Sequence, residues 1–369
     1  MEFYYSEEEV MLQRSVREML KEKNTIPHVR QYVDEQVVSQ ELRQLIAQQG
    51  ILNMFDLENE EEKGMIPGVI IAQEAGRFLL TYPYIEAILA TSLLSTCDNA
   101  EKTVANISSG KVLPTIAWTS MEATAVKVEG DQFIANGILK EVPFAKDADI
   151  ILASVRVLGS GFTAKEEETL IIIDAKSEKL SIRNSESMDE TYPLYEVALH
   201  DYTFDRSSIL IEEGMGSGHE KMRQLKQIGS LLLAAEITGA SERMMSSTVK
   251  YLKEREQFGV VIGSFQSLKH MAADMFMQIE SMKVAIDYSA WTIDVNHEEA
   301  VEAVSIAKSY ASANSVKIAG DAIQMHGGIG YTWENDMHLY FKRIRRASSL
   351  LGNSYANRET IAKLVIDQY

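Results

Sequence analysis

The spacing of apolar residues changes twice along this chain of 369 residues. Up to about residue 94 they recur every three or four positions, which is typical of helices that pack on one face. Over about 112–212 they alternate with polar residues or gather in short runs, which is typical of strands, and the helical spacing then returns. The chain is therefore predicted to be an α+β multidomain protein. The predicted parts are an N-terminal all-α domain (1–111), a small β-sandwich or barrel (112–213) and a C-terminal four-helix bundle (214–369).

Local signals at the ends of the helical stretches support this division. Ser6 and Glu9 form the S-x-x-E pattern of a capping box, so a helix is expected to begin after Ser6. Tyr82-Pro83 interrupts the helical pattern of the N-terminal part, and Gly327-Gly328 ends a later helix in the manner of a C-cap. The helices predicted for the bundle cover about 222–252, 268–286, 301–323 and a last stretch from about 357.

The composition is that of an acidic globular protein. With 36 Lys and Arg against 54 Asp and Glu, the formal net charge is -18, which repels nucleic acids and anionic membranes, so neither is expected as a partner. The single cysteine, Cys97, cannot form an internal disulfide, and no apolar run is long enough to span a membrane. The start MEFYYSEEEV lacks the pattern of a signal peptide. We therefore predict a cytoplasmic protein and no metal site.

Two glycine-containing segments hold charged, aromatic and polar residues that the end of a helix does not require. The first is REQFGVVIGSFQ (255–266), which sets Arg255, Phe258 and Gln266 around a turn between two helices. The second is QMHGGIGY (324–331), at the end of the third bundle helix. From the residues alone, a packed helix turn and a C-cap would explain both segments.

Together with the helix–β–helix order, these segments resemble the acyl-CoA dehydrogenase family of flavoproteins over nearly the whole chain. The resemblance implies FAD at the interface of a homo- or hetero-oligomer, a dimer or a tetramer. It also implies α,β-dehydrogenation of an acyl-CoA thioester in fatty acid metabolism, with an electron-transfer flavoprotein as the acceptor. In that reaction a glutamate removes the α proton, and the flavin takes the β hydride.

The resemblance also implies a role for each residue of the two segments. Arg255 matches an arginine that pairs with the FAD pyrophosphate of a neighbouring subunit, a task that suits the guanidinium fork. Phe258 and Ile262 match residues that line the adenosine region, and Gln266 matches a polar contact beside them. A last group matches the segment whose backbone approaches the same pyrophosphate: Gln324, Gly327 and Gly328.

The chain departs from the family where the catalytic base is expected. The family's two base positions match Leu351 and Gly229, and neither residue is a carboxylate. Glu236 lies about two turns after Gly229 on the same predicted helix and is the candidate substitute base. A buried contact between helices is the alternative interpretation of Glu236. The basic cluster of Lys342, Arg343, Arg345 and Arg346 is predicted to form a solvated or interfacial face, in preference to a phosphate site.

The segments that hold the flavin ring in the family are altered as well. Thr119 is retained, but Ser120-Met121 replaces the usual Glu-Pro, and Glu141-Val142-Pro143-Phe144 replaces Trp-Ile-Thr-Asn. In this respect the chain resembles the divergent small subunits of heteromeric acyl-CoA dehydrogenases. Two functions remain open: an FAD-dependent acyl-CoA dehydrogenase acting as a homo-oligomer, or a non-catalytic partner subunit that completes the FAD sites of a catalytic chain.

Overall fold

The computed structural model describes residues 5–54, 64–97, 99–128, 132–158, 168–210 and 218–366. The chain forms two compact units. The first comprises Met1–Asp34, Gly64–Thr81 and Ser230–Tyr369, and the second comprises Glu35–Lys63 and Tyr82–Gly229. The helices of residues 1–111 are thus divided between the two units, and the three domains of the sequence analysis stay a prediction.

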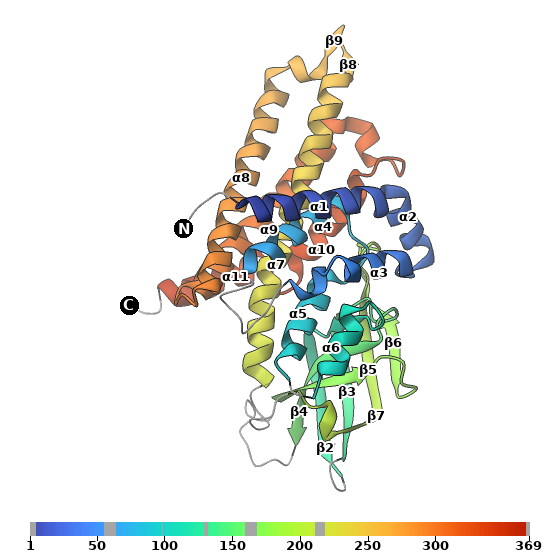
Figure 1. Cartoon of the computed structure of the whole chain (residues 1–369). Helices are drawn as coiled ribbons and strands as arrows, with labels where there is room; N and C mark the ends of the chain where they lie inside the picture. The colour runs from blue at the N-terminus through green and yellow to red at the C-terminus, as the bar shows by residue number, and fades with distance from the viewer. Residues whose placement is uncertain are drawn as a thin grey trace. The chain divides into compact units, whose positions relative to one another are not determined.

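The first unit is built of helices and one short two-stranded hairpin (Figure 1). The N-terminal helix begins after Ser6, whose side chain accepts a hydrogen bond from the Glu9 amide, so the predicted capping box is confirmed. In the C-terminal part α8, α10 and α11 all pack on α9. The elements of this unit are α1 (Glu7–Lys23), α2 (Ile26–Glu35), α4 (Met65–Phe78), α7 (Gly218–Glu254) from Ser230 onward, β8 (Glu256–Gln257), β9 (Val260–Val261), η3 (Ile262–Ser264), α8 (Gln266–Asp294), α9 (Ala300–His326), η4 (Gly327–Tyr331), α10 (Met337–Ser349) and α11 (Ser354–Val365).

Helix α10 was not predicted. Its buried face combines the apolar residues Leu339 and Ile344 with two arginines, Arg343 and Arg346. Two charged residues at core positions break the apolar repeat on which the prediction depended. The predicted last helix does exist, but it begins at Ser354, three residues earlier than expected.

Helices α4 and α7 cross with their backbones in contact. A Cβ atom added to Gly76 would lie 1.8 Å from the carbonyl oxygen of Glu236, and one added to Gly239 would lie 1.8 Å from that of Gln73. No side chain fits in either place, so the crossing requires glycine on both helices. Both positions are in the interior of a helix, where glycine is otherwise unfavourable.

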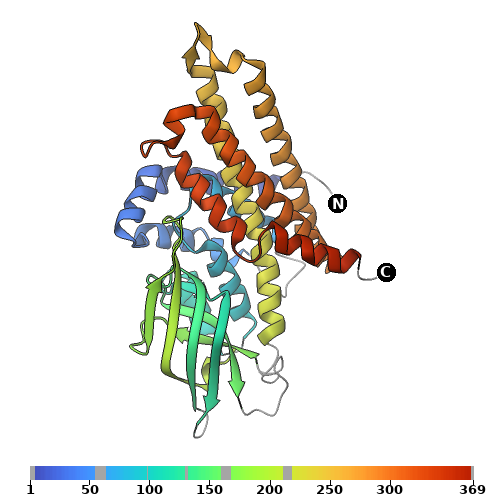
Figure 2. The ribbon, with the colours of Figure 1, turned by 180° about the vertical axis from the view of Figure 1, so that it is seen from behind.

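The second unit combines helices with one seven-stranded sheet, seen from behind in Figure 2. Strands β1 and β2 lie one after the other along the same edge of β4, both parallel to it, and β5 is antiparallel to the other edge. From β2 the sheet continues through β3 and β7 to β6, all antiparallel. The elements are α3 (Gln40–Gln48), η1 (Ile51–Asn53), α5 (Tyr84–Ser95), α6 (Glu101–Ser108), β1 (Pro114–Ile116), β2 (Thr119–Lys127), β3 (Gln132–Pro143), β4 (Ile150–Leu158), β5 (Glu168–Asp174), β6 (Leu180–Asn184), β7 (Leu194–Asp205), η2 (Arg206–Ser208) and the first turns of α7.

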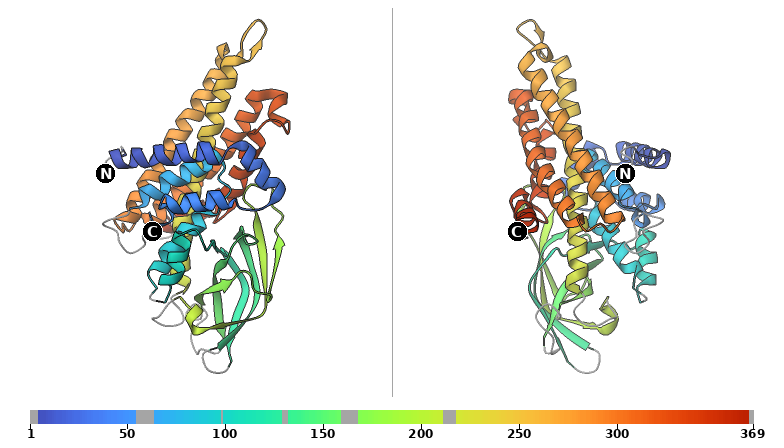
Figure 3. Two further views of the ribbon diagram at one scale, coloured as in Figure 1. Left: turned by 45° about the vertical axis from the view of Figure 1, so that its right-hand side comes forward. Right: turned by 90° about the vertical axis from the view of Figure 1, so that its left-hand side faces the viewer.

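The strands predicted between about residues 112 and 212 are confirmed by this sheet, because β1 to β7 all lie between Pro114 and Asp205. Alternating residues of β3 and β7 face one apolar core that includes Phe133, Leu139, Val197 and Phe204. Figure 3 shows the sheet in two further views. The sequence also predicts a strand–turn–strand around Gly130-Asp131, where apolar and polar residues alternate on both sides, but these two residues lie outside the described part of the chain. Among the helices that the structure describes, none is long and apolar enough to cross a membrane.

Candidate functional site

The segment 255–266 forms a hairpin at the junction of α7 and α8 (Figure 1). Gln257 pairs with Val260, which leaves Phe258 and Gly259 as a two-residue loop. Both loop residues have positive φ, 55° and 78°, as a type I′ turn requires. A bulky side chain in this conformation is strained, and such strain is typical of sites where the surroundings or the function demand it. Phe258 is also 93% exposed, so the turn presents an aromatic ring to its surroundings.

The backbone around Arg255 is fixed while its side chain is exposed. The Arg255 amide donates to the carbonyl oxygen of Tyr251 at 2.9 Å, and the carbonyl oxygen of Arg255 accepts from the Ile262 amide at 2.8 Å. Gln266 begins α8 and is exposed, and Ile262 is half-buried. The guanidinium is therefore carried on an ordered backbone and remains accessible to a partner.

The second segment is tied to the end of α7. The ring of His326, the last residue of α9, stacks on Tyr251 with 4.6 Å between ring centroids. Gly327 follows with φ 64° and ψ -144°, a conformation open in practice only to glycine. A Cβ atom added to Gly327 or Gly328 would meet nothing within 4 Å, so the backbone faces open space there. Such a surface admits a ligand close to the main chain.

Glu236 is buried in the first unit between two arginines of α10. Its Oε1 atom is 2.9 Å from Nη1 of Arg343 and 3.1 Å from Nη2 of Arg346, and only 3% of Glu236 is exposed. Arg343 also donates to the carbonyl oxygen of Leu80 at 3.2 Å. These contacts match the alternative interpretation of Glu236 as a link between helices.

The expectation that the basic cluster forms a solvated or interfacial face is wrong for two of its four residues. Arg343 is 0% exposed and Arg346 is 7% exposed. Both turn inward because they pair with a carboxylate that lies about 110 positions away in the sequence. Only Arg345 is fully solvent-facing, and Lys342 lies over the ring of Trp333 at 5.2 Å.

Lys308 of α9 belongs to the same buried group, and it donates to the carbonyl oxygen of Ala347. Burial, reinforced by the nearby charge of Arg346, lowers the pKa of Lys308 to about 7, against the opposing effect of Glu236. Between pH 7 and about 10 the unfolded chain therefore holds a proton here that the folded chain lacks. The Lys308 contribution to the free energy of unfolding rises with pH across this window, by at most about 1.4 kcal/mol per pH unit.

Lys308→Met is expected to flatten this rise. The measurement is urea unfolding of both proteins at several pH values between 7 and 10. The matched control is Lys317→Met on the same helix, whose amine lies at the surface beside Asp321. Parallel stability curves for the native protein and Lys308→Met would contradict the assignment.

The two positions of the family's base hold no carboxylate. Leu351 has a positive φ of 55° and is followed by Gly352 at 100°. The carbonyl oxygen of Leu351 accepts a hydrogen bond of 3.4 Å from Ser230, the residue that follows Gly229. This turn is held by hydrogen bonds from Asn357, whose side chain donates to the carbonyl oxygens of Gly352 and Asn353.

In the second unit, the residues that match the family's flavin-ring contacts bond to or pack against other residues of this chain. The Thr119 hydroxyl donates to Oε2 of Glu141 at 2.7 Å. Phe144 is 0% exposed and meets Tyr192 edge-on at 4.6 Å. Glu141 and Phe144 both have positive φ, so the end of β3 departs from regular strand geometry. The one retained residue of the ring site is thus engaged by the residue that replaces the family's tryptophan.

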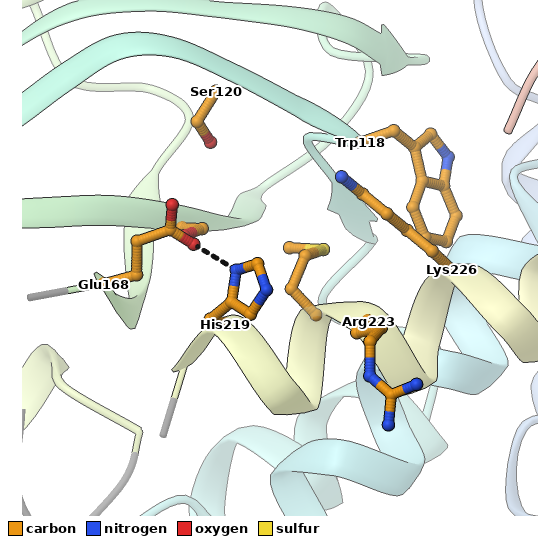
Figure 4. A pocket seen from close by; sticks show the side chains of 8 residues that line it. Trp118, Ser120, Glu168, His219, Arg223 and Lys226 are labelled. Atoms are coloured by element: carbon orange, nitrogen blue, oxygen red, sulfur yellow. Dashed lines mark hydrogen bonds and ion pairs between the residues drawn. The ribbon is translucent and has the colours of Figure 1, made fainter. Parts of the chain in front are cut away.

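A cavity of about 250 Å³ in the second unit was not predicted (Figure 4). Its lining is formed by Trp118, Ser120, Ser154, Glu168, His219, Met222, Arg223 and Lys226. His219 Nδ1 is 3.2 Å from Glu168 Oε2, and burial lowers the pKa of Lys226 while Glu168 and Glu141 oppose the shift. These residues come from four separate segments without a common motif, so only the fold could reveal them. Among the residues that the structure describes, no group is arranged to hold a metal ion.

Comparison with known proteins shows a similarity to acyl-CoA dehydrogenases. Residues 216–366 match the family model described as "Acyl-CoA dehydrogenase, C-terminal domain". The chain is 42% identical over 135 residues to acyl-CoA dehydrogenase IpdE2 of Mycobacterium tuberculosis. That match covers 37% of this chain and only 40% of the relative's length.

Two solved structures have the same fold over almost the entire chain. The acyl-CoA dehydrogenase of Geobacillus kaustophilus superimposes with a TM-score of 0.88 at 21% identity, covering 99% of this chain and 100% of that one. A chain of the ChsE4–ChsE5 complex of Mycobacterium tuberculosis superimposes with a TM-score of 0.87 at 20% identity, covering 99% of each chain. Residues 216–366 thus match the C-terminal domain of acyl-CoA dehydrogenases, and the chain as a whole has the fold of the acyl-CoA dehydrogenase from Geobacillus kaustophilus.

Proposed function

We propose that the chain is a subunit of a heteromeric FAD-dependent acyl-CoA dehydrogenase, and that it completes FAD sites whose flavin ring is held by a catalytic partner chain. The observation that carries this proposal is a contrast between two sets of residues. The set that faces a neighbour's cofactor in the family is exposed apart from the half-buried Ile262, whereas in the set that holds a chain's own flavin ring the Thr119 hydroxyl is bonded to Glu141.

The first set fits the pyrophosphate and adenosine half of FAD. Arg255 offers a charged fork on a fixed backbone, and Gly327 and Gly328 leave room for a phosphate group beside the main chain. Phe258 supplies an exposed aromatic ring for the adenosine side. Ile262, Gln266 and Gln324 complete the set proposed to contact the cofactor.

The second set does not fit a flavin ring. The hydroxyl of Thr119 is already donated to Glu141, and a carboxylate replaces the aromatic side chain that the family places there. Leu351 and Gly229 supply no base, and the carboxylate of Glu236 is occupied by Arg343 and Arg346. We therefore assign Glu236 a structural role and place the catalytic glutamate on the partner.

Within such an assembly the FAD would supply the acceptor for the substrate's β hydride. This chain would bind and orient the cofactor through Arg255 and the Gly327–Gly328 backbone. The substrate would be an acyl-CoA thioester, and an electron-transfer flavoprotein would accept the electrons in a cytoplasmic pathway of fatty acid metabolism. The fold also occurs in the ChsE4–ChsE5 complex, which supports an assembly of two different chains.

The flavin content of the assembly tests the proposal. Co-expression with a related chain that carries a catalytic glutamate should give a heteromer with one FAD for each pair of chains. The chain on its own should not be reduced rapidly by acyl-CoA under anaerobic conditions, because a positioned base contributes about 10²–10⁴-fold to the rate. A homo-oligomer with one tightly bound FAD per chain would contradict the proposal. Rapid bleaching that is lost in Glu236→Gln would instead establish a homo-oligomeric enzyme with Glu236 as its base.

Arg255→Ala is expected to weaken FAD binding by the flavin-bearing assembly. Loss of a charge-assisted hydrogen bond costs about 1.5–3 kcal/mol, or roughly tenfold to hundredfold in affinity. FAD retention on gel filtration and fluorescence titration of the apoprotein measure the change. Arg358→Ala removes an exposed arginine of α11 and serves as the matched control. Equal FAD affinities for the two variants would remove Arg255 from the site.

A further inference from the structure

The cavity of the second unit contains a positive charge and a buried hydroxyl that face a common space. Lys226 lies on the third turn of α7, and Figure 4 shows its amine and the hydroxyl of Ser120 both pointing into the cavity. The guanidinium of Arg223 points away from this space and pairs with Glu220, so it is not counted in the site.

The Ser120 hydroxyl is the observation that points to a ligand. Its oxygen is buried and has no hydrogen-bond partner within the described part of the chain. Buried polar atoms are nearly always satisfied, so an unsatisfied hydroxyl on a cavity wall calls for a group that enters the cavity. A hydroxyl can donate to an oxyanion, and the neighbouring amine can supply the charge.

On the opposite wall of the cavity, the polar side chains of Glu168, His219 and Ser154 interact with one another. Oε2 of Glu168 lies 3.2 Å from Nδ1 of His219 and accepts from the hydroxyl of Ser154 at 3.4 Å. This carboxylate confines a second anion to the side of Lys226 and Ser120. The amine can adapt to such a ligand because burial lowers the pKa of Lys226, and an arriving anion would restore the charged form.

The size of the cavity limits the ligand. A volume of about 250 Å³ corresponds to roughly eight water molecules at about 30 Å³ each, and it lies below the usual range for drug-sized ligands. A whole dinucleotide cannot be enclosed there, but a phosphate or carboxylate group with a few further atoms can. We propose that this cavity is a binding site for a small oxyanion, or for the anionic end of a larger ligand, held between the Lys226 amine and the Ser120 hydroxyl.

Calorimetric titration of the purified protein, in the assembly that it forms, tests this site with inorganic phosphate and with acetate, against sodium chloride of equal ionic strength. Lys226→Met should weaken binding at least about tenfold, and Ser120→Ala by about two- to tenfold. The matched control is Lys179→Met, an exposed lysine of the same unit, which should bind like the native protein. Binding of phosphate alone, acetate alone or both would support the site and identify the chemical class of its ligand.

A second measurement uses the native protein, so it needs no folded variant. The rate at which acetic anhydride modifies Lys226, followed by mass spectrometry, should fall when the bound anion is present and should not change with chloride. The proposal is overturned if neither anion binds the native protein, if Lys226→Met binds as well as the native protein, or if a bound anion leaves the modification rate unchanged. None of these readings involves FAD, so they fail or succeed independently of the proposed function.

Discussion

Glu236→Gln is expected to lower the free energy of unfolding by about 3–5 kcal/mol, because it removes one partner of a buried ion pair and leaves two arginines without their carboxylate. Glutamine has nearly the same shape, so the loss would report the charge and not a cavity. Urea unfolding measures the change, and the slope with denaturant should stay the same. The same variant in the flavin-bearing assembly should retain the chemistry, since the proposed base lies on another chain.

Glu220→Gln is the matched control for this prediction. Glu220 pairs with Arg223 at the surface, where an ion pair contributes about 0–1 kcal/mol. If Glu236→Gln were as stable as the control but inactive, Glu236 would be a catalytic residue and the structural assignment would have to be abandoned.

Gly76→Ala should also be destabilising, by about 3 kcal/mol, at the upper end of the usual cost of overpacking. The added methyl group would lie 1.8 Å from the Glu236 carbonyl oxygen, and backbone atoms of a packed helix cannot move aside as a flexible side chain can. The helices would have to separate, which would disturb the layer that holds Glu236. Thermal and urea unfolding would both show the loss.

Gly320→Ala is the same substitution in another helix, and it is expected to stabilise the protein. Gly320 is exposed in the interior of α9, and its added methyl group would meet nothing within 4 Å. Alanine is favoured over glycine in a helix, so this variant should gain about 0.8–1 kcal/mol. A similar change for Gly76→Ala and Gly320→Ala would show that the close crossing of α4 and α7 does not exist in solution.

Most of the secondary structure could be predicted because it follows from local chemistry. The capping box at Ser6 and Glu9 begins α1, and the alternation of residues in β3 and β7 gives strands with one buried face. Helix α10 escaped prediction because its core positions hold arginines whose carboxylate partner lies on another helix. A pattern of apolar residues cannot reveal a charge that is buried only because a distant residue neutralises it.

The segments proposed to contact a neighbour's cofactor could be predicted from the sequence, whereas the interactions around Thr119 and Lys226 could not. The segments around Arg255 and Gly327 are contiguous in sequence, so a resemblance could single them out, and the structure describes them as exposed and open, though their contacts with a cofactor stay a prediction. The engagement of Thr119 by Glu141 depends on strand pairing between β2 and β3. The cavity around Lys226 depends on four segments that meet only after folding.

The exposed ring of Phe258 at the tip of the hairpin affects the solubility of the separate chain. A newly made subunit displays this ring at 93% exposure, held in a backbone conformation that phenylalanine disfavours. Asparagine at this position would relieve the backbone strain of the turn and remove an exposed apolar side chain. It would therefore favour the yield and storage of the separate subunit. The exposed and strained phenylalanine is therefore unfavourable for the separate chain, and the cofactor contact proposed for its ring would offset that cost in the assembly.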